Sequence, residues 1–118
     1  MARPHPTLAL LAALAALAAP ARAEELIRVV VAEGLPRVAL SGDGLSVREP
    51  EEEGAGRAVG DAVEVAPSGD GLRVGRDELP GAVVIGAAAP IRMGGRTLST
   101  VVQVERSAAG LTVVEELP

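Results

Sequence analysis

Short apolar runs separated by turn-forming residues are the feature that most limits the folds open to this chain. From residue 26 onward, runs rich in valine alternate with segments of glycine, proline, aspartate and serine. β-Branched residues favour strands, and the residues between the runs favour tight turns. No segment after residue 26 has a sustained period near 3.6. We therefore predict an all-β fold of short antiparallel strands and hairpins over residues 24–118.

Two kinds of strand are expected. Residues 26–31 are almost continuously apolar, which predicts a strand buried on both faces. Residues 63–65 and 102–105 alternate valine with a polar residue, which predicts strands with one face in water.

A seven-residue pattern occurs three times, at residues 41–47, 68–74 and 107–113. The first two copies read Ser-Gly-Asp-Gly-Leu-x-Val, and the third has lost the aspartate. Glycine supplies the positive φ that hairpin turns need, and each copy follows an apolar segment. The repeat therefore predicts three β-hairpins. Residues 49–60, with Glu51, Glu52 and Glu53 among glycines, are expected to form a mobile acidic loop.

Several chemistries are excluded by composition. The chain has no Phe, Tyr, Trp or Cys, all eleven of its basic residues are arginine, and its one histidine is His5. Base stacking, aromatic platforms for sugars, thiolate metal sites, imidazole triads and lysine Schiff bases are thus unavailable. The formal charge of -5 also argues against nucleic acid as a partner.

The remaining candidate sites have simpler interpretations. Asp43 and Asp70 offer one carboxylate per turn, whereas a calcium loop needs several oxygen ligands, so turn chemistry is favoured. Gly69-x-Gly71 lacks the spacing of a dinucleotide fingerprint. Glu115 and Glu116 are adjacent, so on a strand they would point to opposite faces and could not act as an acid/base pair. We therefore predict no catalytic, cofactor-binding or metal site.

The first 23 residues have the three parts of a secretory signal. Arg3 is followed by an apolar stretch at residues 8–19, and Ala21 and Ala23 give the small-x-small pattern before Glu24. Twelve apolar residues are fewer than the roughly twenty that a membrane-spanning helix needs, which argues against a stable membrane anchor. The sequence predicts export across the cytoplasmic membrane to the periplasm or cell envelope.

Four stretches after the signal resemble the first part of the SpoIID/LytB domain family. The most specific is residues 109–118, Ala-Gly-Leu-Thr-Val-Val-Glu-Glu-Leu-Pro, where the family has Gly-Leu-Thr-Val-Val-Asn-Glu-Leu-Pro followed by Leu-Glu-Asp-Tyr. Residues 27–34, 36–44 and 90–96 also match. Two departures are Glu115, where asparagine is usual, and residues 98–100, Leu-Ser-Thr, where the family tends to have Tyr-Arg-Gly.

The resemblance implies a secreted protein that remodels peptidoglycan, with peptidoglycan or a cell-wall hydrolase as its partner. Sporulation members of the family are lytic transglycosylases, and their acidic catalytic residue lies beyond the part that residue 118 reaches. The leading hypothesis is therefore the N-terminal, β-rich portion of such a protein, inactive by itself.

Two alternatives stay open. One is a complete, non-enzymatic envelope module that binds cell wall or a protein partner through an exposed sheet edge. The other is a truncated reading frame with no stable role. Truncation would deprive the strand at residues 111–115 of its downstream neighbours, and the apolar edge left exposed would promote self-association.

We predict cleavage between Ala23 and Glu24 during export, because the apolar run is short and Ala21 and Ala23 fit the peptidase pattern. N-terminal sequencing of the exported protein checks this, and a membrane-bound form that still begins near Met1 would contradict it.

Overall fold

The computed structural model describes residues 27–117, and every regular element in this part is a β-strand. The strands are β1 (Ile27–Leu35), β2 (Val38–Arg48), β3 (Arg57–Ser68), β4 (Gly71–Val74), β5 (Asp77–Leu79), β6 (Ala82–Gly86), β7 (Arg92–Met93), β8 (Arg96–Thr97), β9 (Val101–Ser107) and β10 (Gly110–Leu117). The all-β prediction is confirmed. Residues 27–117 contain no helix that could cross a membrane. The predicted signal peptide and its cleavage site lie outside the described residues.

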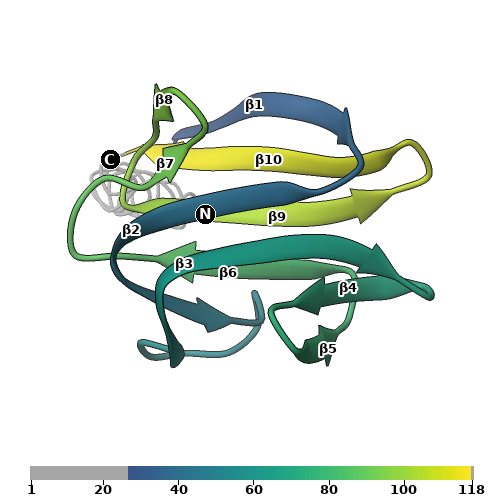
Figure 1. The fold of residues 1–118 in the computed structure, drawn as a ribbon, viewed down its shortest axis with the longest axis horizontal. Helices are drawn as coiled ribbons and strands as arrows, with labels where there is room; N and C mark the ends of the chain where they lie inside the picture. Colours follow the sequence, from purple (N-terminus) through teal and green to yellow (C-terminus); the bar gives the residue numbers. More distant parts are fainter. Residues whose placement is uncertain (1–26, 118) are drawn as a thin grey trace, which may run out of the picture.

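The strands form one antiparallel sheet that folds over on itself. Their order is β1-β10-β9-β6-β2-β3-β4-β5, and the β7–β8 hairpin is attached to β2. β2 and β3 are the longest strands, and both curve strongly, so that each belongs to two layers (Figure 1). One layer contains β1, β10, β9 and β6, and the other contains the first half of β2, the second half of β3, and β4. The core fills the space between them.

Valine, leucine and isoleucine make up this core, and within residues 27–117 no buried residue is polar or charged. The two alternating segments behave as predicted: Val63 and Val65 are buried on either side of the exposed Glu64, and Val102 and Val104 are fully buried. Each strand thus contributes one face to the core, as a period of two requires.

The strand expected to be buried on both faces is an edge strand instead. Within the described residues β1 pairs only with β10, and Ile27, Val29 and Val30 are 59%, 39% and 54% exposed. The prediction for residues 26–31 was wrong because a continuous apolar run specifies strand propensity but not the number of layers that cover the strand. Leu26 lies outside the described residues.

The strand at residues 111–115 is not an exposed edge. It belongs to β10, which pairs with β1 on one side and with β9 on the other. The expectation of an unpaired apolar edge there was wrong, and the open edge is β1.

Two copies of the repeat form hairpins, as predicted. Between β3 and β4, Ser68 pairs with Gly71, and Gly69 has a φ of +57°. Between β9 and β10, Ser107 pairs with Gly110, and the positive φ, +131°, is at Gly110 rather than within the turn. This shift explains how the third copy can have alanines where the others have Gly-Asp.

The first copy, residues 41–47, is a bulge inside β2, so the prediction of a hairpin there was wrong. Ser41 pairs with Ala62 and Leu45 with Gly60, so three residues of β2 face one residue of β3. Gly44, with a φ of +63°, donates its backbone N–H to Asp61 Oδ1 at 3.0 Å. Because β3 pairs with both halves of β2, the same sequence bends a strand here instead of reversing it.

The acidic loop is shorter than residues 49–60, because β3 begins at Arg57 and residues 57–60 pair with β2. The assignment of residues 57–60 to the loop was wrong. Arg48 Nη1 donates to the carbonyls of Glu49, Pro50 and Glu52 at 2.9–3.4 Å, and Glu52 Oε1 accepts from Glu49 N at 2.6 Å. These bonds give residues 49–52 a defined turn.

Two arginines connect elements that no ladder joins. Arg106 Nη1 in β9 donates to the carbonyls of Gly69 and Gly71 at the β3–β4 turn, at 2.6 and 2.9 Å. Arg96 Nη1 in β8 donates to the carbonyl of Val31 in β1 at 3.0 Å. Each long side chain thus joins two elements that share no backbone hydrogen-bond ladder.

Gly110→Ala should destabilise the fold more than Gly69→Ala. A Cβ at Gly110 would meet the Leu35 carbonyl oxygen at 2.8 Å in a backbone region that is nearly restricted to glycine, whereas a Cβ at Gly69 would have nothing within 4 Å. We expect Gly110→Ala to lower the free energy of unfolding by about 3 kcal/mol and Gly69→Ala by about 1 kcal/mol. Urea denaturation measures both, and equal losses would contradict the structure.

Candidate functional site

The residues that could carry chemistry all lie at the surface of the described part. No buried residue between 27 and 117 is charged or polar, and no three Asp, Glu, His or Cys residues in this part come close enough to hold a metal ion. The features that a site in this region can use are surface shape, open backbone groups and exposed charged side chains.

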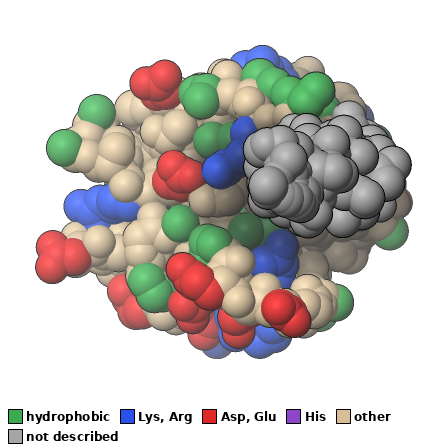
Figure 2. All heavy atoms as spheres, turned by 180° about the vertical axis from the view of Figure 1, so that it is seen from behind, with side chains coloured by type: hydrophobic (Ala, Val, Ile, Leu, Met, Phe, Trp, Pro, Cys, Tyr) green, Lys and Arg blue, Asp and Glu red, His purple; other side chains and the backbone are tan. Residues whose placement is uncertain are grey.

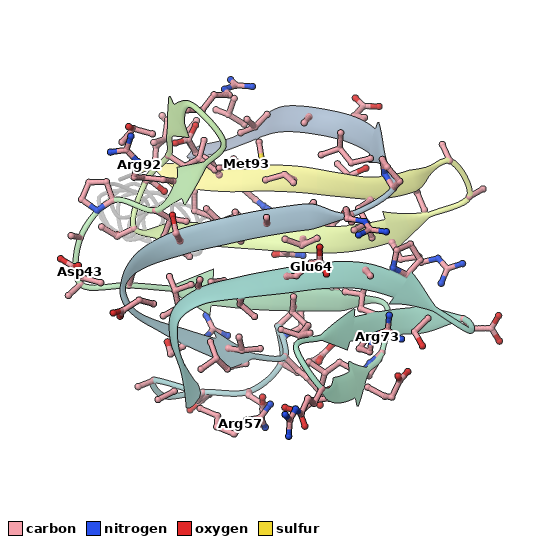
Figure 3. All side chains as sticks on the ribbon, in the orientation of Figure 1. Asp43, Arg57, Glu64, Arg73, Arg92 and Met93 are labelled. Carbon is pink, nitrogen blue, oxygen red and sulfur yellow. The ribbon has the colours of Figure 1, made fainter. Side chains whose placement is uncertain are left out.

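The two Gly-Asp-Gly segments are not brought together. Asp43 lies in the bulge of β2, at the bend (Figure 3), whereas Asp70 lies in the turn after the far end of β3. The carboxylate with a structural contact in this region is Asp61, which accepts from Gly44 N. Asp61 was missed because its partner is 17 residues away and no local pattern marks it.

The carboxylates of the β2–β3 connection are on the outside. Glu51, Glu52 and Glu53 are exposed, and acidic side chains gather along the lower margin of the molecule, where this connection and β5 lie (Figure 2). Glu52 accepts from its own turn, as described above. Glu52 therefore stabilises the turn, and all three glutamates add to the negative charge of the surface.

Glu115 and Glu116 occupy the last strand, as predicted, and Glu115 has a structural contact. Its Oε1 accepts from Ser99 N at 2.8 Å, while Ser99 Oγ lies 2.7 Å from the Glu116 carbonyl oxygen and 2.8 Å from that of Val101, so its one proton is donated to either of the two. Ser99 thus connects the segment before β9 to β10. Sequence reasoning missed Ser99 because serine in a loop has no distinctive spacing.

The feature that stands out is the open edge at β1. The three large hydrophobic residues that are exposed in the described part, Ile27, Val29 and Val30, all belong to this strand. An apolar strand edge with unpaired backbone groups is a template for another strand. The sequence showed an apolar strand here but placed it in the interior.

A polar network lies next to this edge, on the outer face of the sheet. Arg28 Nη2 donates to Gln103 Oε1 at 3.0 Å and to Glu105 Oε2 at 3.3 Å, and Gln103 Nε2 donates to Glu105 Oε2 at 2.7 Å. Because β10 lies between β1 and β9, these side chains cross β10 near Val114. The Val114 side chain is only 6% exposed, although no described strand covers this face of the sheet. Figure 2 shows charged side chains among apolar ones on this side.

The outer face also has an open hollow of about 450 Å³ beside β6. Glycine and alanine make up much of its lining, and the charged residue in the lining is Arg48. Arg48 already donates to three carbonyls of the β2–β3 turn. The hollow therefore has shape but little chemistry, and the β1 edge is the stronger candidate.

Ser99→Ala should destabilise the protein, because the half-buried Oγ no longer donates to a carbonyl of β9 or β10 and the end of β10 loosens. We expect a loss of about 1–2 kcal/mol in the free energy of unfolding. The matched control is Ser107→Ala, which removes one exposed bond of 3.2 Å and should cost less than about 0.5 kcal/mol. Thermal or urea unfolding compares the two, and equal effects would exclude this role for Ser99.

The chain matches no protein-family model, no curated protein and no solved structure. Its function is therefore argued from the β1 edge and its surroundings.

Proposed function

We propose that this chain is an exported cell-envelope protein of the SpoIID/LytB type, and that residues 27–117 form a non-catalytic module that binds a protein partner by strand addition along β1. The observation that carries the proposal is the exposure of Ile27, Val29 and Val30 on an edge strand of nine residues. In strand addition, backbone hydrogen bonds provide affinity and alternate side chains provide specificity.

The other edge of the sheet supports this interpretation by contrast. β5 has three residues, and two of them are the exposed acids Asp77 and Glu78. Asp77 also forms an ion pair with Arg57. A short, charged edge is a common protection against unwanted pairing, whereas β1 is long and apolar. One edge is thus protected and the other is open, as expected if the open edge has a use.

A protein partner suits this surface better than a glycan. Sugars are usually bound against aromatic rings, and the chain has none. β1 instead offers backbone groups and valine side chains, which an extended peptide segment complements.

The resemblance to the SpoIID/LytB family suggests the class of partner. Its segments meet around the open edge: Ile27 in β1 pairs with Leu117 in β10, and Arg96 in the β7–β8 hairpin donates to Val31. Because the family includes an amidase enhancer, the partner that we propose is a cell-wall amidase. Direct binding to peptidoglycan is the alternative.

Val30→Lys should abolish partner binding, because a charge on the edge strand disfavours pairing with an apolar segment. The exported protein is added to purified sacculi with the host's cell-wall amidase, and release of peptide from the glycan is measured. We expect the wild-type chain to accelerate release and the Val30→Lys variant to have no effect. The chain by itself should release no fragments, because Glu115 and Glu116 are adjacent in β10 and point to opposite faces, so they cannot act as an acid/base pair.

The matched control is Ala58→Lys, which adds the same charge at an exposed position of β3, a strand that does not pair with β1. This variant should accelerate release as the wild type does. Equal activity of Val30→Lys and wild type would refute the role of β1. Co-sedimentation of both with sacculi in the absence of amidase would indicate direct wall binding.

A further inference from the structure

We infer that, in the absence of its partner, β1 pairs antiparallel with β1 of a second copy of this chain about a two-fold axis. This inference rests on the proposed function, because a second copy and the amidase would compete for the same edge.

β1 is complementary to itself when it runs antiparallel. Arg28 lies near its start and Glu33 near its end, with apolar residues 29–32 between them. A register that places Arg28 opposite Glu33 of the second copy creates two ion pairs by symmetry and brings the apolar residues together. Opposite charges that face each other across a strand pair are favourable, and like charges are unfavourable.

The two charged side chains lie on the same face of the sheet. Arg28 pairs with Glu116, and Val30 with Val114, which places both on the outer face. A bulge at Val31 shifts the register, so that Ala32 pairs with Val113, a core residue. A second register shift lies between Ala32 and Leu35, so Glu33 and Gly34 together face Thr112, which alternates with the core residues Leu111 and Val113 and therefore lies on the outer face. A two-fold axis perpendicular to the sheet keeps the outer faces of the two copies on the same side, so Arg28 of one copy can meet Glu33 of the other.

Arg28 has donors left for this contact. Both of its hydrogen bonds within residues 27–117, to Gln103 and Glu105, are made by Nη2, and a guanidinium has five N–H donors. Glu33 is exposed and takes part in no ion pair of the described part. The Val31 carbonyl already accepts from Arg96, so the new pairing would use the residues on either side of this bulge.

The overall charge opposes association, but it acts over a longer range than the proposed contacts. The full chain has a formal charge of -5, and without Arg3 and Arg22 of the predicted signal each exported copy has -7. At physiological ionic strength this repulsion is screened over about 8 Å, whereas the proposed ion pairs are in direct contact. We therefore expect a reversible dimer rather than a permanent one.

Charge reversal tests the register. The exported protein is studied by analytical ultracentrifugation, in which the wild type should form a dimer. Glu33→Arg and Arg28→Glu should each weaken the dimer by about 2- to 30-fold, as expected for two cross-strand ion pairs. An equimolar mixture of the two variants should regain wild-type affinity, because each copy then faces opposite charges. Glu78→Arg, the same charge change on β5, should have no effect.

A wild-type protein that is monomeric at every concentration, or a mixture that does not regain affinity, would overturn the inference. Arg28→Glu also loses contacts within its own sheet, so its folding is verified by circular dichroism. If it fails to fold, Glu33→Gln replaces it: the wild-type dimer should weaken with salt, and the Glu33→Gln dimer should weaken less. A monomer whose amidase effect is still abolished by Val30→Lys would leave the proposed function intact and remove only the second copy.

Discussion

The bulge at residues 42–44 is the constraint on which the rest of the structure depends. A sheet in which every strand is straight has two open faces and encloses nothing, and residues 27–117 have no helix to cover either one. The bulge lets β2 turn from one layer into the other, because its first half pairs with β7 at Ser41 and its second half with β6 from Ser46 onward. β3 follows the same bend. The Asp61 carboxylate stabilises it by accepting from the amide of Gly44, which has positive φ.

Once the sheet is folded, the core must be filled without aromatic side chains. Many small, stiff side chains replace a few large ones, and β-branched residues keep their preferred rotamers in strands. Such a core gives little directional information, since it contains no polar group that must find a partner. Polar contacts outside the core supply that direction instead: the turn glycines, the contact of Ser99 with β10, and the arginines that donate to carbonyls of elements outside their own ladders.

The features that the sequence predicted correctly depend on neighbouring residues, whereas the features that it did not predict depend on residues far apart in the chain. The alternation at Val63–Val65 is local, and it correctly predicted which side chains are buried. The two repeat copies that reverse the chain were also predicted, because a hairpin depends on adjacent residues. The copy at residues 41–47 was not, since β3 decides between a turn and a bulge. The candidate edge was missed for the same reason: whether β1 is covered depends on the sheet order. The contact between Arg28 and Glu105 joins residues that are 77 positions apart, and no sequence pattern predicts it.

The unequal edges of the sheet also limit how large an assembly can become. A protein with two compatible edges can add copies indefinitely and form fibres, whereas a protein with one can be satisfied by a single pairing. β5 is too short and too acidic to serve as the second, and its Asp77 is engaged with Arg57. Of the two strands at the ends of the sheet, β1 is therefore the one that can take an added strand. If copies associate through these terminal strands, growth stops when β1 is covered.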